Sequence, residues 1–141
     1  MNMRAPRSAA DALELFSEWA DRVEMDHRIM LAMANSDVEG RLVFKLKAPD
    51  LFMVFISDGF GIRIKCQWTF RGNPDMEITT ALFHDALFGI RNLMISLNKR
   101  QLGECLRDKD NGGMFELLLE LQPMAAGIYR EIIRERGLAL E

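Results

Sequence analysis

Residues 62–70 read IRIKCQWTF, and this stretch decides the fold class. Apolar and polar residues alternate over its full length, which indicates a β-strand with one face on an apolar core and the other face in water. The polar face is predicted to carry Arg63 and Lys65. The apolar face is predicted to hold the other alternating set: Ile62, Ile64, Cys66, Trp68 and Phe70.

Three more strands flank this one in the sequence. GRLVFKLK alternates in the same way, LFMVFI is apolar on both faces as in the middle of a sheet, and MEITT follows a turn. The Asp58-Gly59 pair predicts a tight hairpin between LFMVFI and IRIKCQWTF. The region from Gly40 to Thr80 therefore predicts an antiparallel meander with one apolar face and one wet face. Its three additional strands are residues 40–47, 51–56 and 76–80.

Helical spacing of apolar residues occurs on both sides of this meander. Ser8 and Asp11 have the arrangement of a helix N-cap, and apolar residues then recur every three or four positions. A short helix is predicted from Ala81, and the apolar stretch MFELLLELQPM (114–124) predicts a terminal helix that Pro123 must bend or split. A fifth strand is predicted between these two helices, at QLGECLR (101–107).

This order of elements predicts an α+β fold in a single domain, residues 1–141. About five strands are expected to form a mostly antiparallel sheet, with the helices packed on one of its faces. The chain is then divided into an N-terminal helical segment, a core and a C-terminal helical extension: residues 8–35, 40–124 and 125–141.

Composition argues against several classes of function. Charged residues make up 28% of the chain and the net charge is −3, so the basic stripe of a nucleic-acid-binding protein is not expected. The longest apolar run, LFMVFI, is far shorter than the ~20 residues of a membrane span. The first residues lack the apolar core of a secretion signal, and the two cysteines are interpreted as reduced, which predicts a cytoplasmic protein.

Four stretches together resemble the sterol carrier protein 2 family of lipid-binding domains. They are the hairpin SDGFG, the run NPDMEITTALFHDALFGIRN, the late strand RQLGECLRD and the apolar helix GGMFELLLELQPM. Their order and spacing match the family over residues 40–124. None of the four is a catalytic signature.

The resemblance implies non-covalent binding of a lipid. In this family an apolar tunnel between sheet and helices holds a fatty acyl chain, a sterol or an isoprenoid, and the terminal helix forms part of its wall. The corresponding ligand-binding residues here would be Ile62, Ile64, Trp68, Phe83, Leu87, Met114, Phe115, Leu118, Leu121 and Met124.

Residues with catalytic or metal-binding chemistry are few. His84 and Asp85 are neighbours on a predicted helix, so their side chains point about 100° apart, and we interpret them as part of a solvated helix face. His27 lies beside Asp26 and near Glu24, without the ligand spacing of a metal site. We therefore predict no enzymatic activity, no cofactor and no metal.

Two functions of different classes stay open. The first is a carrier that binds a fatty acyl, sterol-like or isoprenoid ligand without chemistry, and that makes transient contact with membranes. The second is a protein interaction module or homodimer, in which the same fold has a filled cavity and Met114, Phe115 or Leu118 lies in the contact.

Overall fold

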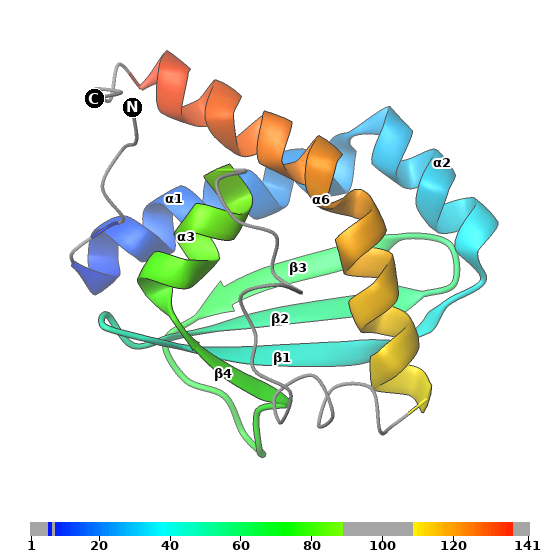
Figure 1. The fold of residues 1–141 in the computed structure, drawn as a ribbon, viewed down its shortest axis with the longest axis horizontal. Coiled ribbons are helices and arrows are strands. Elements are labelled where there is room, and N and C mark those ends of the chain that lie inside the picture. Colours follow the sequence, from blue (N-terminus) through cyan, green and yellow to red (C-terminus); the bar gives the residue numbers. More distant parts are fainter. Residues whose placement is uncertain (1–5, 7, 89–108, 137–141) are drawn as a thin grey trace.

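The computed structural model describes residues 6, 8–88 and 109–136 of the chain. It has an α+β fold, as predicted, in which helices cover one face of a sheet (Figure 1). The predicted fifth strand, residues 101–107, lies outside the described residues. In chain order the described elements are α1 (Ala9–Met25), α2 (His27–Ser36), β1 (Glu39–Lys47), β2 (Leu51–Asp58), β3 (Ile62–Gln67), β4 (Met76–Thr79), α3 (Thr80–Phe88) and α6 (Lys109–Glu135).

Two capping side chains set the ends of the N-terminal helices. The Ser8 hydroxyl accepts a hydrogen bond from the Asp11 N–H at 3.0 Å and begins α1, as predicted. Asp26 ends α1 and begins α2, because its carboxylate accepts hydrogen bonds from two backbone N–H groups in the first turn of α2. The predicted helical segment 8–35 is therefore two helices that change direction at Asp26.

The sheet has the strand order β3-β2-β1-β4. β1, β2 and β3 are joined as antiparallel hairpins, with Leu42 opposite Phe55 and Phe55 opposite Ile64, so this part of the predicted meander is confirmed. β4, however, pairs with β1 and runs parallel to it. The prediction that residues 76–80 continue an antiparallel meander is therefore wrong.

The segment 68–75 accounts for this change of partner. A chain that leaves one edge of a sheet and returns in the same direction must cross the sheet, and this segment passes along its underside (Figure 1). Asp75 fixes the arrival beside β1. Its backbone N–H donates to the Val43 carbonyl oxygen at 2.9 Å, and its carboxylate accepts from the Val43 N–H at 2.8 Å. Alternation of apolar residues carries no information about this pairing.

β3 is shorter than predicted: it ends at Gln67, whereas the predicted strand continues to Phe70. Trp68 is 52% exposed instead of facing the core. Phe70 lies on the opposite face of the sheet, where its ring centroid is 6.0 Å from that of Phe52 and 5.3 Å from the guanidinium carbon of Arg41. Once the chain leaves its pairing with β2, the alternation of faces no longer applies. The last two aromatic residues of IRIKCQWTF therefore belong to the crossing segment.

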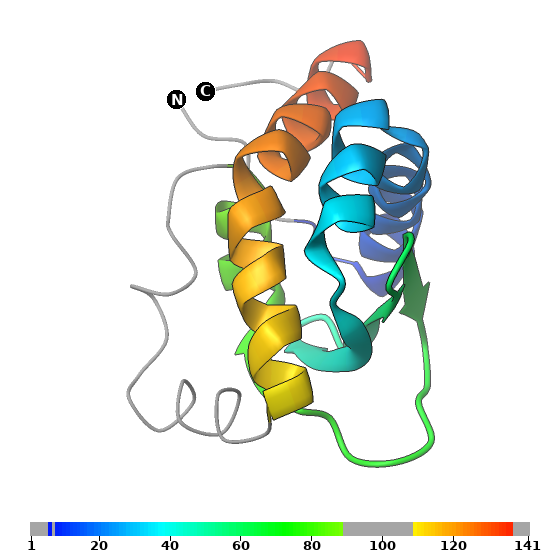
Figure 2. The same cartoon turned by 90° about the vertical axis from the view of Figure 1, so that its right-hand side faces the viewer.

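The helices lie above one face of the sheet (Figure 2). Buried apolar side chains fill the space between the helices and the sheet. That face is apolar on all four strands except for Ser57 near the end of β2, as the alternation in β1, β3 and β4 predicts. The opposite face carries Arg41, Lys45, Arg63 and Lys65 on β1 and β3. The core side chains of the strands are Leu42, Phe44, Leu46, Leu51, Met53, Phe55, Ile62, Ile64, Met76 and Ile78.

Helix α6 contains Pro123 in its interior. Its ribbon bends near the middle of the helix (Figure 1), where a proline is the usual cause of a bend. Its first half crosses over the strands, and its second half is tied to α1 and α3 by side-chain contacts such as those of Glu135 with Arg22 and Tyr129 with His84. The boundary predicted between residues 124 and 125 falls inside this helix, which continues to Glu135. A proline therefore bends this helix without ending it.

Candidate functional site

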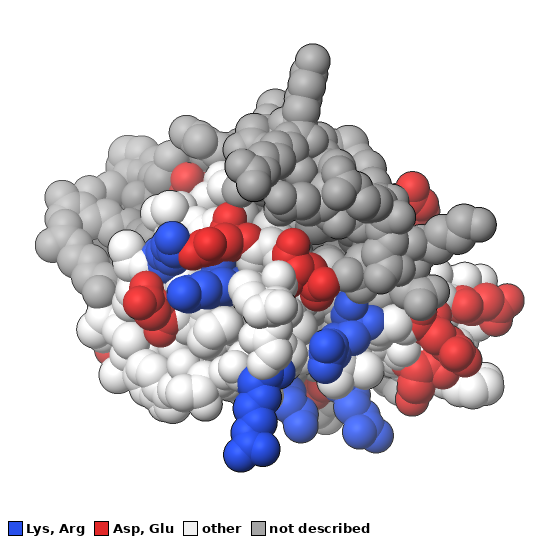
Figure 3. Space-filling model, turned by 90° about the horizontal axis from the view of Figure 1, so that it is seen from below, with Lys and Arg blue, Asp and Glu red and all other residues white. Residues whose placement is uncertain are grey.

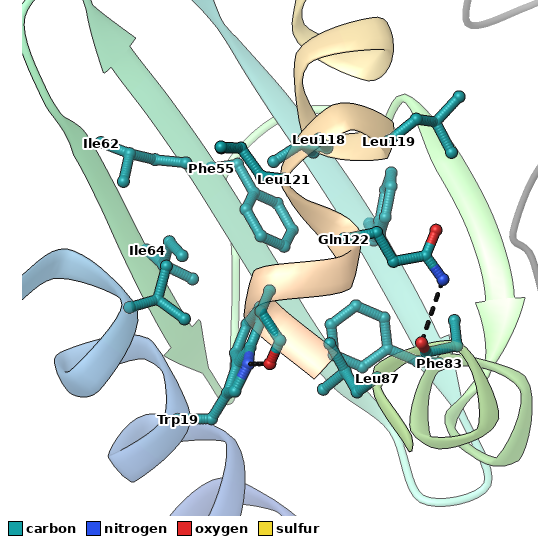
Figure 4. A pocket seen from close by; sticks show the side chains of 14 residues that line it. Trp19, Phe55, Ile62, Ile64, Phe83, Leu87, Leu118, Leu119, Leu121 and Gln122 are labelled. Atoms are coloured by element: carbon teal, nitrogen blue, oxygen red, sulfur yellow. Dashed lines mark hydrogen bonds between the residues drawn. The ribbon is translucent and has the colours of Figure 1, made fainter. Parts of the chain in front are cut away.

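A small apolar cavity lies between the sheet and the helices, where the sequence predicts a ligand site (Figure 4). Its volume is about 60 Å³. α1, α3 and α6 and the first three strands all contribute to its wall. The lining residues are Trp19, Val23, Phe44, Phe55, Ile62, Ile64, Phe83, Ala86, Leu87, Leu118, Leu119, Leu121, Gln122 and Ala125.

Aromatic side chains form a rigid part of this wall. The Phe44 and Phe55 rings meet edge to face with their centroids 5.5 Å apart. Trp19 stands edge-on to both Phe55 and Phe83, with centroid distances of 6.3 and 6.0 Å. Such pairs are stabilised by the ring quadrupoles beyond the area they bury. The three elements that carry these rings, α1, α3 and the sheet, are therefore held together around the cavity.

The polar side chains at the wall are already engaged in hydrogen bonds. The Trp19 indole N–H donates to the Ala125 carbonyl oxygen at 3.0 Å, and the Gln122 side-chain amide donates to the Ala86 carbonyl oxygen at 3.0 Å (Figure 4). No charged side chain is among the described residues that line the cavity. A buried charge would have no counter-charge there, so the cavity favours neutral apolar groups.

Pro123 changes the backbone chemistry of the same wall. It has no N–H, so the carbonyl of Leu119 lacks its usual donor four residues later in the helix. Leu119 lines the cavity and is half-buried, as is Leu118. The part of α6 that contributes these side chains is thus joined to the rest of the helix at a weakened point.

The structure brings together Ile62, Ile64, Phe83, Leu87, Leu118 and Leu121 from the predicted set of ligand-binding residues. Met114 is fully buried in the core but does not line the cavity. Trp68 is exposed on the crossing segment, and Met124 is half-buried away from the wall. The side chain of Phe115 lies outside the described part of the chain.

Several wall residues were missed because their elements were not assigned to the site. Trp19 and Val23 come from α1, whose apolar face was recognised but which was not assigned to the wall of the ligand site. Phe44 lies on the apolar side of the alternating strand β1, and that alternation is the signal that places it. Phe55 lies in β2, which is apolar on both faces, and only its pairing with Leu42 and Ile64 places it on the core face. Gln122 is a polar residue within an apolar helix, and no pattern in the sequence marks it as a wall residue.

The candidates for catalysis do not form a catalytic site. His84 is fully buried, which corrects its interpretation as part of a solvated face, and its Nδ1 lies 2.8 Å from the Tyr129 hydroxyl oxygen. Burial raises the pKa of Tyr129 well above its usual value, so the phenol stays neutral. His27 is exposed, and the described residues contain no group of His, Cys, Asp and Glu side chains that could hold a metal ion.

The size of the cavity limits what it can hold in this conformation. An engineered cavity of ~150 Å³ binds benzene, and typical ligand pockets measure ~300–1,000 Å³. At about 60 Å³ the cavity is smaller than either. A longer hydrocarbon can enter only if part of the wall moves.

None of the helices in the described part of the chain is long and apolar enough to span a bilayer. Comparison of the chain with known protein families, with characterised proteins and with solved structures gives no match. The resemblance to the sterol carrier protein 2 family therefore stays a prediction.

Proposed function

We propose that this chain binds the hydrocarbon part of a lipid or a similar neutral apolar molecule in the cavity and does not change it chemically. The observation that carries the proposal is the wall itself, which combines rigid aromatic rings with aliphatic side chains and has no charged group among its described residues. A polar or charged end of the ligand is expected to stay outside. The likeness of this chain to the sterol carrier protein 2 family stays a prediction, and so does its location in the cytoplasm.

Binding requires the cavity to widen, and the first half of α6 is the element best placed to move. It supplies Leu118, Leu119 and Leu121 to the wall, and it meets the second half at Pro123. The rest of the wall is held by aromatic contacts between α1, α3 and the sheet. We therefore propose that an entering ligand displaces the leucines of α6 and leaves the aromatic wall in place.

The gain on binding comes from removing hydrocarbon from water. Each buried CH₂ group contributes about 0.8 kcal/mol, and this has to offset the loss of ligand freedom and the movement of α6. One additional CH₂ group changes affinity only modestly. A set of ligands of similar length, and not a single compound, is the expected result.

The test is to fill the cavity and measure uptake of 1-dodecanol by isothermal titration calorimetry. Ala86 is buried in the wall, and Ala86→Leu adds three carbons there. The added carbons leave room in the cavity for two fewer CH₂ groups of the ligand, each of which contributes about 0.8 kcal/mol. We therefore expect the affinity for dodecanol to fall by a factor of about ten or more. Ala34→Leu makes the same change at an exposed position of α2 and is the matched control.

The proposal is contradicted if the unmodified protein does not bind dodecanol and an organic extract of it contains no lipid. Equal affinity of Ala86→Leu and Ala34→Leu places the ligand elsewhere and also contradicts it. Melting temperatures of both variants show that each is folded. A filled cavity is expected to leave the melting temperature of Ala86→Leu unchanged or slightly higher.

A protein interaction module is the second candidate, and one observation favours it. Met25, Met30 and Leu31 are 77%, 46% and 66% exposed at the end of α1 and on α2, although large apolar side chains usually avoid water. Met114 is fully buried and cannot be the contact that the sequence predicts. Light scattering on Leu31→Glu and on the unmodified protein tests this candidate, because a dimer that becomes monomeric in the variant identifies α2 as the contact.

A further inference from the structure

We propose that the face of the sheet turned away from the helices docks on an anionic lipid bilayer. This inference rests on the proposed function, because it names the surface from which the ligand would be taken or to which it would be delivered. The docking surface is defined by four cationic side chains, here called the basic face: Arg41, Lys45, Arg63 and Lys65.

The strand register gathers these cations in a small area. Arg41 and Arg63 lie in one row on either side of Ile56, and Lys65 and Lys45 follow in the next two rows. Strands are ~4.8 Å apart and residues rise ~3.3 Å, so the four Cα atoms lie within about 10 by 13 Å. The chain as a whole has a net charge of −3, whereas this cluster is positively charged.

The cations of the basic face have no ion-pair partner within the described part of the chain. Arg41 stacks over the Phe70 ring at 5.3 Å, a contact that leaves its charge available. On the same sheet Lys47 does pair with Glu77. Figure 3 shows the molecule from below, where several Lys and Arg side chains lie close together and Asp and Glu side chains lie on either side of them. Such a surface attracts an anionic partner.

Exposed aromatic side chains favour a bilayer over another kind of anionic partner. Phe60 is 81% exposed just before β3, and Trp68 is 52% exposed just after it. Tryptophan and phenylalanine insert at the level of lipid headgroups, whereas attraction of an acidic polypeptide to the basic face needs only charge. The cations Arg63 and Lys65 lie between these two aromatic residues in the sequence.

β3 also connects the basic face to the cavity. Ile62 and Ile64 point into the cavity wall, while Arg63 and Lys65 point to the opposite face. β3 is an edge strand with no neighbouring strand on its outer side in the described sheet. A bilayer that contacts the basic face and the two exposed aromatic residues therefore lies next to one wall of the ligand site.

The test measures binding of the full chain to vesicles by co-sedimentation. Vesicles of phosphatidylcholine alone are compared with vesicles of equal parts phosphatidylcholine and phosphatidylglycerol. We expect binding only to the anionic vesicles and a decrease as salt is raised. Each basic side chain near an anionic surface strengthens binding about fivefold, so Lys65→Glu, which changes the charge by two, is expected to weaken binding about 30-fold.

Arg134→Glu is the matched control, because Arg134 is exposed near the end of α6, away from the basic face. It makes the same charge change and is expected to leave vesicle binding nearly unaltered. Intrinsic fluorescence gives a second readout. The chain has two tryptophans, and Trp19 is 3% exposed, so a blue shift on adding anionic vesicles reports Trp68 and is lost in Trp68→Phe.

Absence of binding to the anionic vesicles overturns the inference, and so does an equal loss in Lys65→Glu and Arg134→Glu. Binding to heparin or polyglutamate that depends on Lys65, without binding to vesicles, also overturns it, because the partner is then a soluble polyanion. The proposed function is judged separately by dodecanol titration without vesicles. Arg63→Glu combined with Lys65→Glu is expected to keep the dodecanol affinity, since both side chains point away from the cavity.

Discussion

Nδ1 of His84 lies 2.8 Å from the hydroxyl oxygen of Tyr129, and both side chains are completely buried. His84 belongs to α3 and Tyr129 to the second half of α6, so this contact joins two of the helices that cover the sheet. The rings also meet edge to face with centroids 5.5 Å apart. A buried polar pair of this kind specifies one arrangement of the two helices, because any other arrangement leaves polar atoms without partners.

The variant Tyr129→Phe is expected to lower the free energy of unfolding by about 1–3 kcal/mol. It removes the hydroxyl that contacts His84 and leaves a buried ring nitrogen with one partner fewer. Urea denaturation followed by circular dichroism measures the loss. In His84→Leu combined with Tyr129→Phe the loss is expected to be smaller than the sum of the two single losses, because the two residues interact. Additive losses would show that the contact is not energetically coupled.

Cys66 is expected to react slowly with thiol reagents in the folded protein. Burial raises the pKa of its thiol to about 12, and only the thiolate reacts. At pH 8 the thiolate fraction is then about one in ten thousand, against about a quarter for an ordinary thiol of pKa ≈ 8.5. Ellman's reagent measures the rate in Cys105→Ser, in which Cys66 is the sole cysteine.

The same variant in urea provides the comparison for Cys66, and there we expect a rate at least about a hundredfold higher. The reaction is also expected to accelerate with rising pH up to pH 10 and beyond, since the folded thiol is still mostly protonated there. A fast reaction at pH 8 without urea would contradict the half-buried position of Cys66 on the core face of β3.

The sequence predicts the core-facing residues of β1 and β3 because one side of those strands is buried, and burial on one side produces alternation. It does not do so for β2, which is apolar on both faces. It predicts the start of α1 because Ser8 is a local signal. Six wall residues of the cavity, among them Ile64, Leu87 and Leu118, belong to these apolar patterns, and the resemblance to the sterol carrier protein 2 family is what assigned them to a ligand site. Each of these features depends on residues close together in the chain.

The features that the sequence does not predict depend on contacts between distant residues. The pairing of β4 with β1 rests on Asp75 and Val43, which are 32 positions apart. The place of Trp19 in the cavity wall rests on its hydrogen bond to Ala125, 106 positions away. His84 is polar and was predicted to lie on a solvent-exposed face, because spacing alone could not identify Tyr129 as its partner in the core.

Asp26→Ala is expected to destabilise the protein by about 1 kcal/mol at pH 7, because Asp26 caps the N-terminus of α2. The hydrogen bond from the Arg28 side chain, followed by those from backbone N–H groups, holds the pKa of the Asp26 carboxyl below its usual value. A lowered folded-state pKa means that this stabilisation is present above about pH 4, the unfolded value, and is lost as the pH falls through the folded value.

The pH dependence of the Asp26 effect is measured by urea denaturation of the unmodified protein and Asp26→Ala between pH 2 and pH 7. The two stabilities are expected to converge at the acidic end. Asp21→Ala is a suitable control, because Asp21 is exposed within α1 and caps neither helix. A constant difference down to the lowest pH would contradict a role for the charged carboxylate.

Gly127→Ala is expected to raise the free energy of unfolding by about 0.5–1 kcal/mol, because glycine in a helix interior is less favourable than alanine. Gly127 lies in the second half of α6, and an added Cβ there meets no atom within 4 Å. Thermal unfolding followed by circular dichroism measures the change. A lower melting temperature would mean that the site has less room than the backbone indicates.

Pro123→Ala tests the proposal that α6 opens at its bend. Alanine restores an N–H that can donate to the Leu119 carbonyl, so the helix is expected to stiffen and the free energy of unfolding to rise, by at most about 3 kcal/mol. If the leucines before the bend must move to admit a ligand, dodecanol should bind more slowly in stopped-flow measurements. Gly127→Ala also strengthens α6 but lies past the bend, and its association rate is expected to match that of the unmodified protein. Equal rates in all three proteins would mean that the ligand enters without movement at Pro123.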